Sequence, residues 1–264
     1  MILEAITWNV NPKIFTLFGK MEVRWYGLLF ASGFLFGYLI FSKFFKKEKL
    51  PSELLDKLTI YMAIGTILGA RLGHCLFYEP SYYLKNPLEI LMVWKGGLAS
   101  HGAAIGILIA LFLFSRKYKK PFIWILDRIV VVVALAGAFI RLGNLMNSEI
   151  YGIETNLPWG FIFVRNQDFV PKHPTQIYES LMCLIIFGLL LWIYYKNDAK
   201  PRPGLMFGLF LVILFVFRFF VEYIKEVQVD FESTMPINMG QILSIPFIII
   251  GIIVLVWSYK HKPK

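Results

Sequence analysis

Charged residues and cysteine are both scarce in this chain of 264 residues. Charged side chains make up only 17% of it, whereas hydrophobic ones make up 58%, and the mean hydropathy is +0.64. Ordinary globular proteins are far less apolar, so the composition excludes a soluble globular protein and indicates an integral membrane protein. The two cysteines, Cys75 and Cys183, lie in separate apolar stretches, and we expect both to be small buried residues rather than metal ligands.

Acidic residues are also few, because 17 aspartates and glutamates stand against 27 lysines and arginines, with a net charge of +10. A nucleic-acid-binding surface gathers its cations on one solvated face, whereas these occur in short runs between apolar segments. We therefore expect no nucleic-acid partner. The sequence also lacks any group of histidines, cysteines and carboxylates with the spacing of metal ligands, so we expect no metal and no other cofactor.

Linkers and repeats are lacking as well. No low-complexity segment and no internal repeat divides the chain, and we expect residues 1–264 to form one domain. The N-terminal residues include Glu4 but no basic stretch, which is not typical of a cleaved signal peptide.

Long apolar segments, by contrast, are abundant. Seven of them approach the roughly 20 residues that a helix needs to cross a bilayer. They cover residues 23–43, 59–77, 98–114, 122–146, 176–195, 205–224 and 239–258. The predicted fold is therefore an all-α integral membrane protein with seven transmembrane helices.

The distribution of positive charge predicts the orientation of these helices. More than half of the 27 lysines and arginines lie in four connections on one side, namely 43–57, 116–120, 196–202 and the C-terminal tail. Cytoplasmic connections carry such an excess, so we expect a periplasmic N-terminus and a cytoplasmic C-terminus. The longer connections at 78–97 and 147–175 then face the periplasm.

Polar residues within the apolar segments gather at the periplasmic ends of those segments. A charged side chain at a bilayer centre costs roughly 2.5–3.5 kcal/mol on insertion scales, so such residues need a reason. The residues in question are Tyr26, Arg71, His101, Arg141, Asn144, Glu149, Gln176, Arg218 and Glu222. The inner halves of the later segments are almost purely apolar. We therefore expect a polar cavity that opens to the outer leaflet and is closed below, rather than a channel.

The residue types at these ends predict a phosphate site. Arg218 and Glu222 are four residues apart on one helix face, and Arg141 comes from another helix. Two planar guanidinium groups are suited to one phosphate, and the natural anion in an outer leaflet is a phospholipid head group. His101 lies between glycines at a helix start, where its ring can act as a general base.

Each of these residues also has a plainer interpretation. The Arg218–Glu222 pair can simply neutralise itself in a bundle, and His101 can be a packing residue. Arg71 can extend to the interface as a snorkelling side chain. Asn144 and Gln176 can join helices through hydrogen bonds. Their shared location in one leaflet favours the functional interpretation, because unrelated structural residues would be spread over both.

Eight stretches of the sequence, spread from about residue 20 to the end, resemble one family. They are "RWYG" (24–27), "GARLGH" (69–74), "GGLASHG" (96–102), "RLGNLMNSEIYG" (141–152), "LPWGFIF" (157–163), "HPTQIYE" (173–179), "RPG" (202–204) and "FRFFVEY" (217–223). In this order they are similar to the bacterial prolipoprotein diacylglyceryl transferases, which are seven-helix proteins of the cytoplasmic (inner) membrane. The resemblance implies transfer of the diacylglyceryl group of phosphatidylglycerol to the lipobox cysteine of a prolipoprotein signal peptide. A thioether forms and glycerol phosphate is released.

The resemblance also implies roles for individual residues. By motif, His101, Arg141 and Arg218 match essential residues of the family. Tyr26, Asn144, Glu149 and Glu222 likewise match positions that the family treats as functional. We therefore expect catalysis by His101, Arg141, Arg218 and Tyr26. We expect substrate binding by Asn144, Glu149, Glu222, Arg71 and Gln176. Two positions depart from the family pattern: Ala103 replaces a common second glycine after the histidine, and Leu214 replaces a common tyrosine four residues before the arginine. If that tyrosine transfers protons elsewhere, another group such as Tyr26 takes the role here.

Two other functions remain open from the residues alone. A phospholipid transporter or flippase would bind head groups without chemistry, but it needs polar access from the inner leaflet, which this sequence lacks. An intramembrane peptidase would need paired aspartates or a serine–histidine pair in the membrane, and Asp127 is the lone aspartate in the predicted spans.

Overall fold

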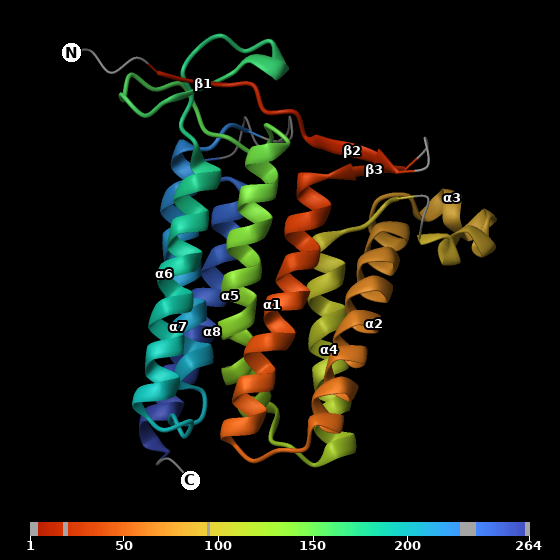
Figure 1. Cartoon of the computed structure of the whole chain (residues 1–264), viewed down its shortest axis with the longest axis vertical. Coiled ribbons are helices and arrows are strands. Elements are labelled where there is room, and N and C mark those ends of the chain that lie inside the picture. Colours follow the sequence, from red (N-terminus) through yellow and green to blue (C-terminus); the bar gives the residue numbers. More distant parts are fainter. Residues whose placement is uncertain (1–4, 18–20, 94–95, 228–235, 262–264) are drawn as a thin grey trace. The chain divides into compact units, whose positions relative to one another are not determined.

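The computed structural model describes residues 5–17, 21–93, 96–227 and 236–261 and is mostly helical. In this part of the chain seven helices are long and apolar enough to cross a membrane (Figure 1). They are α1 (Trp25–Lys47), α2 (Ser52–Phe77), α4 (Ser100–Tyr118), α5 (Phe122–Met146), α6 (Thr175–Lys196), α7 (Leu205–Val221) and α8 (Met239–Lys260). Each predicted segment coincides with one of them, so the seven predicted helices are confirmed.

Shorter elements lie between the long helices. They are the helix α3 (Pro80–Lys85), the 3₁₀ turns η1 (Pro87–Leu91), η3 (Val164–Asn166) and η4 (Glu222–Ile224), and the strands β1 (Ile6–Trp8), β2 (Lys13–Leu17), β3 (Met21–Arg24) and β4 (Phe161–Phe163). The prediction of an all-α protein was wrong in this respect. β2 pairs antiparallel with β3, and β1 pairs parallel with β4. Strands of three to five residues are too short to show alternation, and the β1–β4 pair joins distant parts of the sequence.

The chain divides into two compact units. The first unit comprises residues 1–40 and 126–264, and the second comprises residues 41–125. The expectation of a single domain stays a prediction.

In the first unit, the N-terminal strand is fastened to the end of α5. The indole Nε1 of Trp8 donates a hydrogen bond to the Leu145 carbonyl at 3.0 Å. This carbonyl is one of those at the C-terminal end of a helix that have no partner within the helix. Trp8 also packs, with Tyr151 and Ile177, against the buried cluster of Leu145, Phe161 and Phe163. A small apolar core therefore covers the end of α5 a few residues beyond Arg141.

At the other end of α5, Asp127 closes the N-terminus of α7. Its carboxylate accepts hydrogen bonds from the backbone amides of Gly204 at 2.7 Å and Phe207 at 2.9 Å. These amides have no partner within their own helix, and a carboxylate is favoured at a helix N-terminus. Asp127 is buried, so the lone aspartate of the predicted spans has a structural task.

In the second unit, α2 and α4 are packed through glycines. A side chain at Gly69 would collide with the Gly102 carbonyl and with the backbone of Gly106, and one at Gly73 would lie 2.6 Å from the Gly102 Cα. Small residues allow membrane helices to approach this closely. His101 is held at the start of α4, next to this close contact.

Candidate functional site

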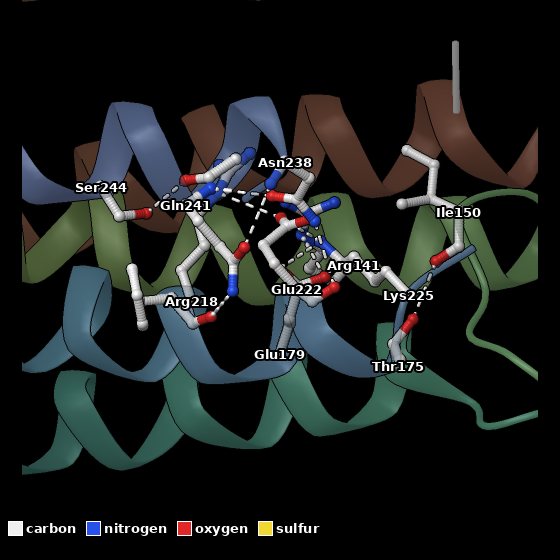
Figure 2. Close-up of polar contacts among 12 residues, drawn as sticks. Arg141, Ile150, Thr175, Glu179, Arg218, Glu222, Lys225, Asn238, Gln241 and Ser244 are labelled. Atoms are coloured by element: carbon white, nitrogen blue, oxygen red, sulfur yellow. Dashed lines mark hydrogen bonds and ion pairs between the residues drawn. The ribbon is translucent and has the colours of Figure 1, made fainter. Parts of the chain in front are cut away.

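The first unit contains a chain of five alternating charges drawn from three helices (Figure 2). Arg141 on α5 lies with its Nε 3.2 Å from Glu179 Oε2 on α6. Lys225, which follows η4, has its Nζ 3.0 Å from both Glu179 Oε1 and Glu222 Oε1. Arg218 on α7 completes the chain, with its Nε 3.4 Å from Glu222 Oε1. The order is therefore arginine, glutamate, lysine, glutamate, arginine.

Solvent exposure differs between the middle and the two arginine ends of this series of charged side chains. The Lys225 side chain is only 3% exposed, and both carboxylates are almost as buried, whereas the side chain of Arg218 is 38% exposed. Because buried charges must be compensated, the buried lysine and carboxylates in the middle of this series satisfy one another, while the more exposed guanidinium of Arg218 can still meet an anion.

Helix α8 supports the Glu222 end. Asn238 Nδ2 donates to the Glu222 carbonyl at 3.1 Å, and its Oδ1 accepts from the Gln241 amide at 2.9 Å as a helix cap. A side chain at Gly240 would collide with the Glu222 carboxylate, so glycine leaves the room that this carboxylate occupies. The position of Glu222 is thus fixed from a fourth helix, α8.

A second branch leads from Arg141 to Glu149. Arg141 Nη1 donates to Asn144 Oδ1 at 3.4 Å, and Asn144 Nδ2 donates to Glu149 Oε1 at 2.8 Å. Asn147 Nδ2 donates to the same Glu149 oxygen at 3.1 Å. Glu149 thus holds two asparagine amides, and the carboxylate that contacts Arg141 is Glu179. Glu149 lies past the end of α5, so its carboxylate accepts hydrogen bonds from the side-chain amides of Asn144 and Asn147.

Tyr26 and Gln176 lie in the same unit. The ring of Tyr26 packs on Gly143, where an added side chain would lie 2.8 Å from its Cδ2. Gln176 is completely buried, and its Nε2 donates to the Glu149 carbonyl at 2.7 Å. The structure therefore gives Gln176 a backbone partner, and we do not carry it forward as a substrate ligand.

Arg71, in the second unit, binds backbone carbonyls of the connection between α2 and α4. Its guanidinium donates to the carbonyls of Glu89, Ile90, Gly96 and Gly97, and it lies 4.9 Å from the centre of the Tyr83 ring. The residue is only 2% exposed. We therefore do not carry forward the prediction that Arg71 binds substrate, because its donors are bound to these backbone carbonyls.

His101, also in the second unit, has an exposed ring bordered by aromatic side chains. Tyr78 stacks on it with ring centres 5.7 Å apart, and Phe77 approaches edge-on at 6.1 Å. Tyr78 also stacks on His74 at 5.6 Å. Sequence reasoning predicted His101 but missed Tyr78, whose position at the end of α2 carries no sequence signal for this contact.

Glu179, Lys225 and Asn238 were also absent from the predicted site. For Lys225 a signal exists, because residues 218, 222 and 225 follow the spacing of one helical face. Glu179 stands in the "HPTQIYE" stretch as an acidic residue of an apolar helix. Asn238 had no comparable signal, since its role depends on how α8 begins.

Replacing Lys225 by methionine, which is similar in length but uncharged, is expected to destabilise the protein. The two carboxylates would keep only their weaker contacts with the arginines, and breaking a buried ion pair costs up to about 3–5 kcal/mol. The thermal midpoint in detergent should fall clearly.

Lys172→Met is the matched control for Lys225→Met. Burial alone would lower the pKa of Lys172, but Glu226 and Asp168 raise it above its ordinary value, so this lysine too is held by carboxylates. Its partner Glu226 is 38% exposed, so water can compensate for the loss. Equal losses of stability in the two variants would contradict the special importance of Lys225, whose two carboxylate partners are both buried.

Comparison with known proteins agrees with these observations. The sequence matches the family model described as prolipoprotein diacylglyceryl transferase over residues 12–257. A protein of Porphyromonas gingivalis named phosphatidylglycerol–prolipoprotein diacylglyceryl transferase is 49% identical, with 99% of this chain and 98% of that protein covered. Proteins of the same name from Tolumonas auensis and Chloroherpeton thalassium are 47% and 46% identical, each over 97% of this chain and over 99% and 95% of their own lengths. The chain therefore belongs to the prolipoprotein diacylglyceryl transferase family.

Proposed function

We propose that this enzyme transfers the diacylglyceryl group of phosphatidylglycerol to the thiol of the lipobox cysteine in a prolipoprotein signal peptide. The family and the names of the relatives support the reaction. The observation that carries it at the level of residues is the chain of charges that ends in Arg141 and Arg218. The Arg218 side chain at its end is 38% exposed, so its guanidinium can meet the negatively charged phosphodiester of phosphatidylglycerol.

The reaction is an in-line displacement at the glycerol carbon that is linked to the head-group phosphate. The cysteine sulfur forms the new carbon–sulfur bond while the carbon–oxygen bond to phosphate breaks. The thiol proton passes to a base and ends on the departing glycerol phosphate. Arg141 and Arg218 bind the phosphate and stabilise the charge that develops on the leaving oxygen; one preorganised donor of this kind contributes on the order of 3–4 kcal/mol.

A base is needed as well. The reference pKa values of a thiol and an imidazole are about 8.5 and 6.5, so proton transfer from one to the other is uphill by roughly 2 units, or about 2.7 kcal/mol. His101 is the proposed base, because its exposed ring can be approached by a substrate. Glu222 is assigned to hold Arg218, and Asn144, itself held by Glu149, to orient Arg141. Tyr26 is the group assigned to transfer protons where the family has a tyrosine at position 214.

The charge distribution supports the location. The protein is assigned to the bacterial cytoplasmic membrane, with its N-terminus and the arginine site on the periplasmic side and its C-terminus in the cytoplasm. Arg141, Glu179 and Lys225 all lie at the ends of helices on the predicted periplasmic side. No further cofactor is required, because thiol, base and phosphate supply the whole reaction.

The test is mass analysis of a lipobox peptide incubated with the purified protein and phosphatidylglycerol. We expect the peptide to gain the mass of one diacylglyceryl group, and a peptide with serine in place of the cysteine to stay unmodified. Cleavage of the peptide would instead indicate a peptidase, although Asp127, with both carboxylate oxygens on the α7 amides, is an unsuitable catalyst. An unmodified peptide would overturn the proposal and leave the flippase alternative, for which the comparisons give no support.

A further inference from the structure

The connection after α5 contains an unusual series of side-chain contacts to the backbone. Each of three successive carbonyls, at residues 148–150, accepts a hydrogen bond from a side chain that is distant in the sequence. Asn166 donates to the first at 2.7 Å, Gln176 to the second at 2.7 Å, and Thr175 to the third at 3.0 Å. Thr175 and Gln176 are completely buried in the first turn of α6. Three side chains thus clamp three consecutive peptide units.

The clamped turn has a conformation that its own residues do not favour. Ser148 has φ 55° and Ile150 has φ 58°, so both lie in the left-handed region without being glycine. For a β-branched residue such as isoleucine this is a genuine outlier. Strained backbone of this kind persists only where surrounding contacts hold it, and it occurs most often at functional sites. The side-chain hydrogen bonds from α6 and from Asn166 are such contacts.

The turn determines where Glu149 points. With both neighbours in the left-handed region, the Glu149 carboxylate reaches back to α5 and accepts hydrogen bonds from Asn144 and Asn147. This fixes the orientation of the Asn144 amide, because its nitrogen is bound to Glu149 and its oxygen must then face Arg141. The side chains that bind the turn therefore fix Glu149, Glu149 fixes Asn144, and Asn144 orients Arg141.

We propose that Thr175 and Gln176 are positioning residues, which hold the turn at 148–150 so that Glu149 and Asn144 orient Arg141 for the head-group phosphate. The proposal rests on the transferase function, in which Arg141 binds that phosphate. Neither side chain touches the substrate, since both are completely buried. They act only through the backbone that they hold.

The test compares Thr175→Val and Gln176→Met with Ser180→Ala in the purified full-length protein. Each removes a buried polar group of α6 that donates to a backbone carbonyl, but Ser180 donates to Ala138, away from the turn. We expect the first two variants to lose about 10- to 100-fold in kcat/KM for phosphatidylglycerol, the range for a small misplacement of a catalytic group. Ser180→Ala should keep a kcat/KM near that of the wild type. Thr175→Ser, which keeps the hydroxyl, should also have a kcat/KM near that of the wild type.

A second variant separates positioning from general stability. Glycine adopts positive φ without cost, so Ile150→Gly should restore part of the activity when it is combined with Thr175→Val. A structural role alone would give no such recovery, because glycine adds no packing. Recovery by Ile150→Gly supports the proposal, and its absence overturns it.

Hydrogen–deuterium exchange gives a readout that does not depend on activity. Backbone amides at 147–152 should exchange faster in Thr175→Val and Gln176→Met than in Ser180→Ala. Unchanged exchange, or equal losses of activity in all three variants, would overturn the proposal. If the wild type fails to transfer lipid, the proposed function is wrong, and the exchange experiment still decides whether these residues hold the turn.

Discussion

Arg141→Lys should lower the rate of diacylglyceryl transfer by about 100- to 1,000-fold while the protein stays folded. Lysine keeps the charge and can keep the contact with Glu179, which Arg141 makes through Nε at 3.2 Å. It lacks the planar fork that allows one side chain to contact Glu179 and Asn144 and still offer donors to a phosphate. The rate is measured as mass gain of a lipobox peptide, and folding as the thermal midpoint in detergent.

Arg128→Lys is the matched control for this experiment. Arg128 lies on the same helix, near its other end, and is buried, whereas Arg141 is partly buried; Arg128 donates to the Ala199 carbonyl at 3.0 Å and lies over the Tyr194 ring. The control measures the general cost of exchanging a buried arginine for lysine in α5, and it should retain most of the activity. If Arg141→Lys transferred lipid at the wild-type rate, the assignment of Arg141 to the phosphate would be wrong.

His101→Gln should lower transfer by roughly 100- to 10,000-fold, the usual contribution of a general base. Glutamine retains polarity and about the same size but does not accept a proton at neutral pH. The stacking of His101 on Tyr78 would be weakened, so the thermal midpoint must be measured alongside the rate. The variant's dependence on pH should also change, because its titrating base is gone.

His74→Gln separates the base from the aromatic packing. His74 stacks on the same Tyr78 ring, so its replacement removes an equivalent ring contact in the same unit. We expect this variant to keep most of the wild-type rate. Retained turnover in His101→Gln, with a pH profile like that of the wild type, would remove His101 from the role of base.

The helices and several site residues could be predicted because their signals are local. Apolar runs of about 20 residues located all seven long helices, although α2 begins at Ser52 rather than at residue 59. The spacing of four residues also predicted the ion pair between Arg218 and Glu222, which the structure contains. Both follow from the geometry of a single helix.

Contacts between helices could not be predicted, because they depend on how each helix is rotated about its axis. Nothing in the sequence indicates that Arg141 contacts Glu179 rather than Glu149, or that Lys225 lies between two carboxylates. Arg71 shows the same limit for loops: its polar side chain resembled a ligand in the sequence, but its partners are backbone carbonyls, which carry no residue signature. The left-handed conformation of Ile150 is likewise invisible to local preferences, since these oppose it.

The exposure of Arg218 also bears on how the reaction ends. The phosphodiester substrate is a monoanion, whereas glycerol phosphate is a monoester whose charge at neutral pH is about −1.5 to −2. The cations of the site are already paired with carboxylates, so they compensate a smaller share of the product's charge than of the substrate's. Water can reach the 38% exposed side chain of Arg218 and solvate the remainder. We therefore expect the chemical step itself to favour release of the product.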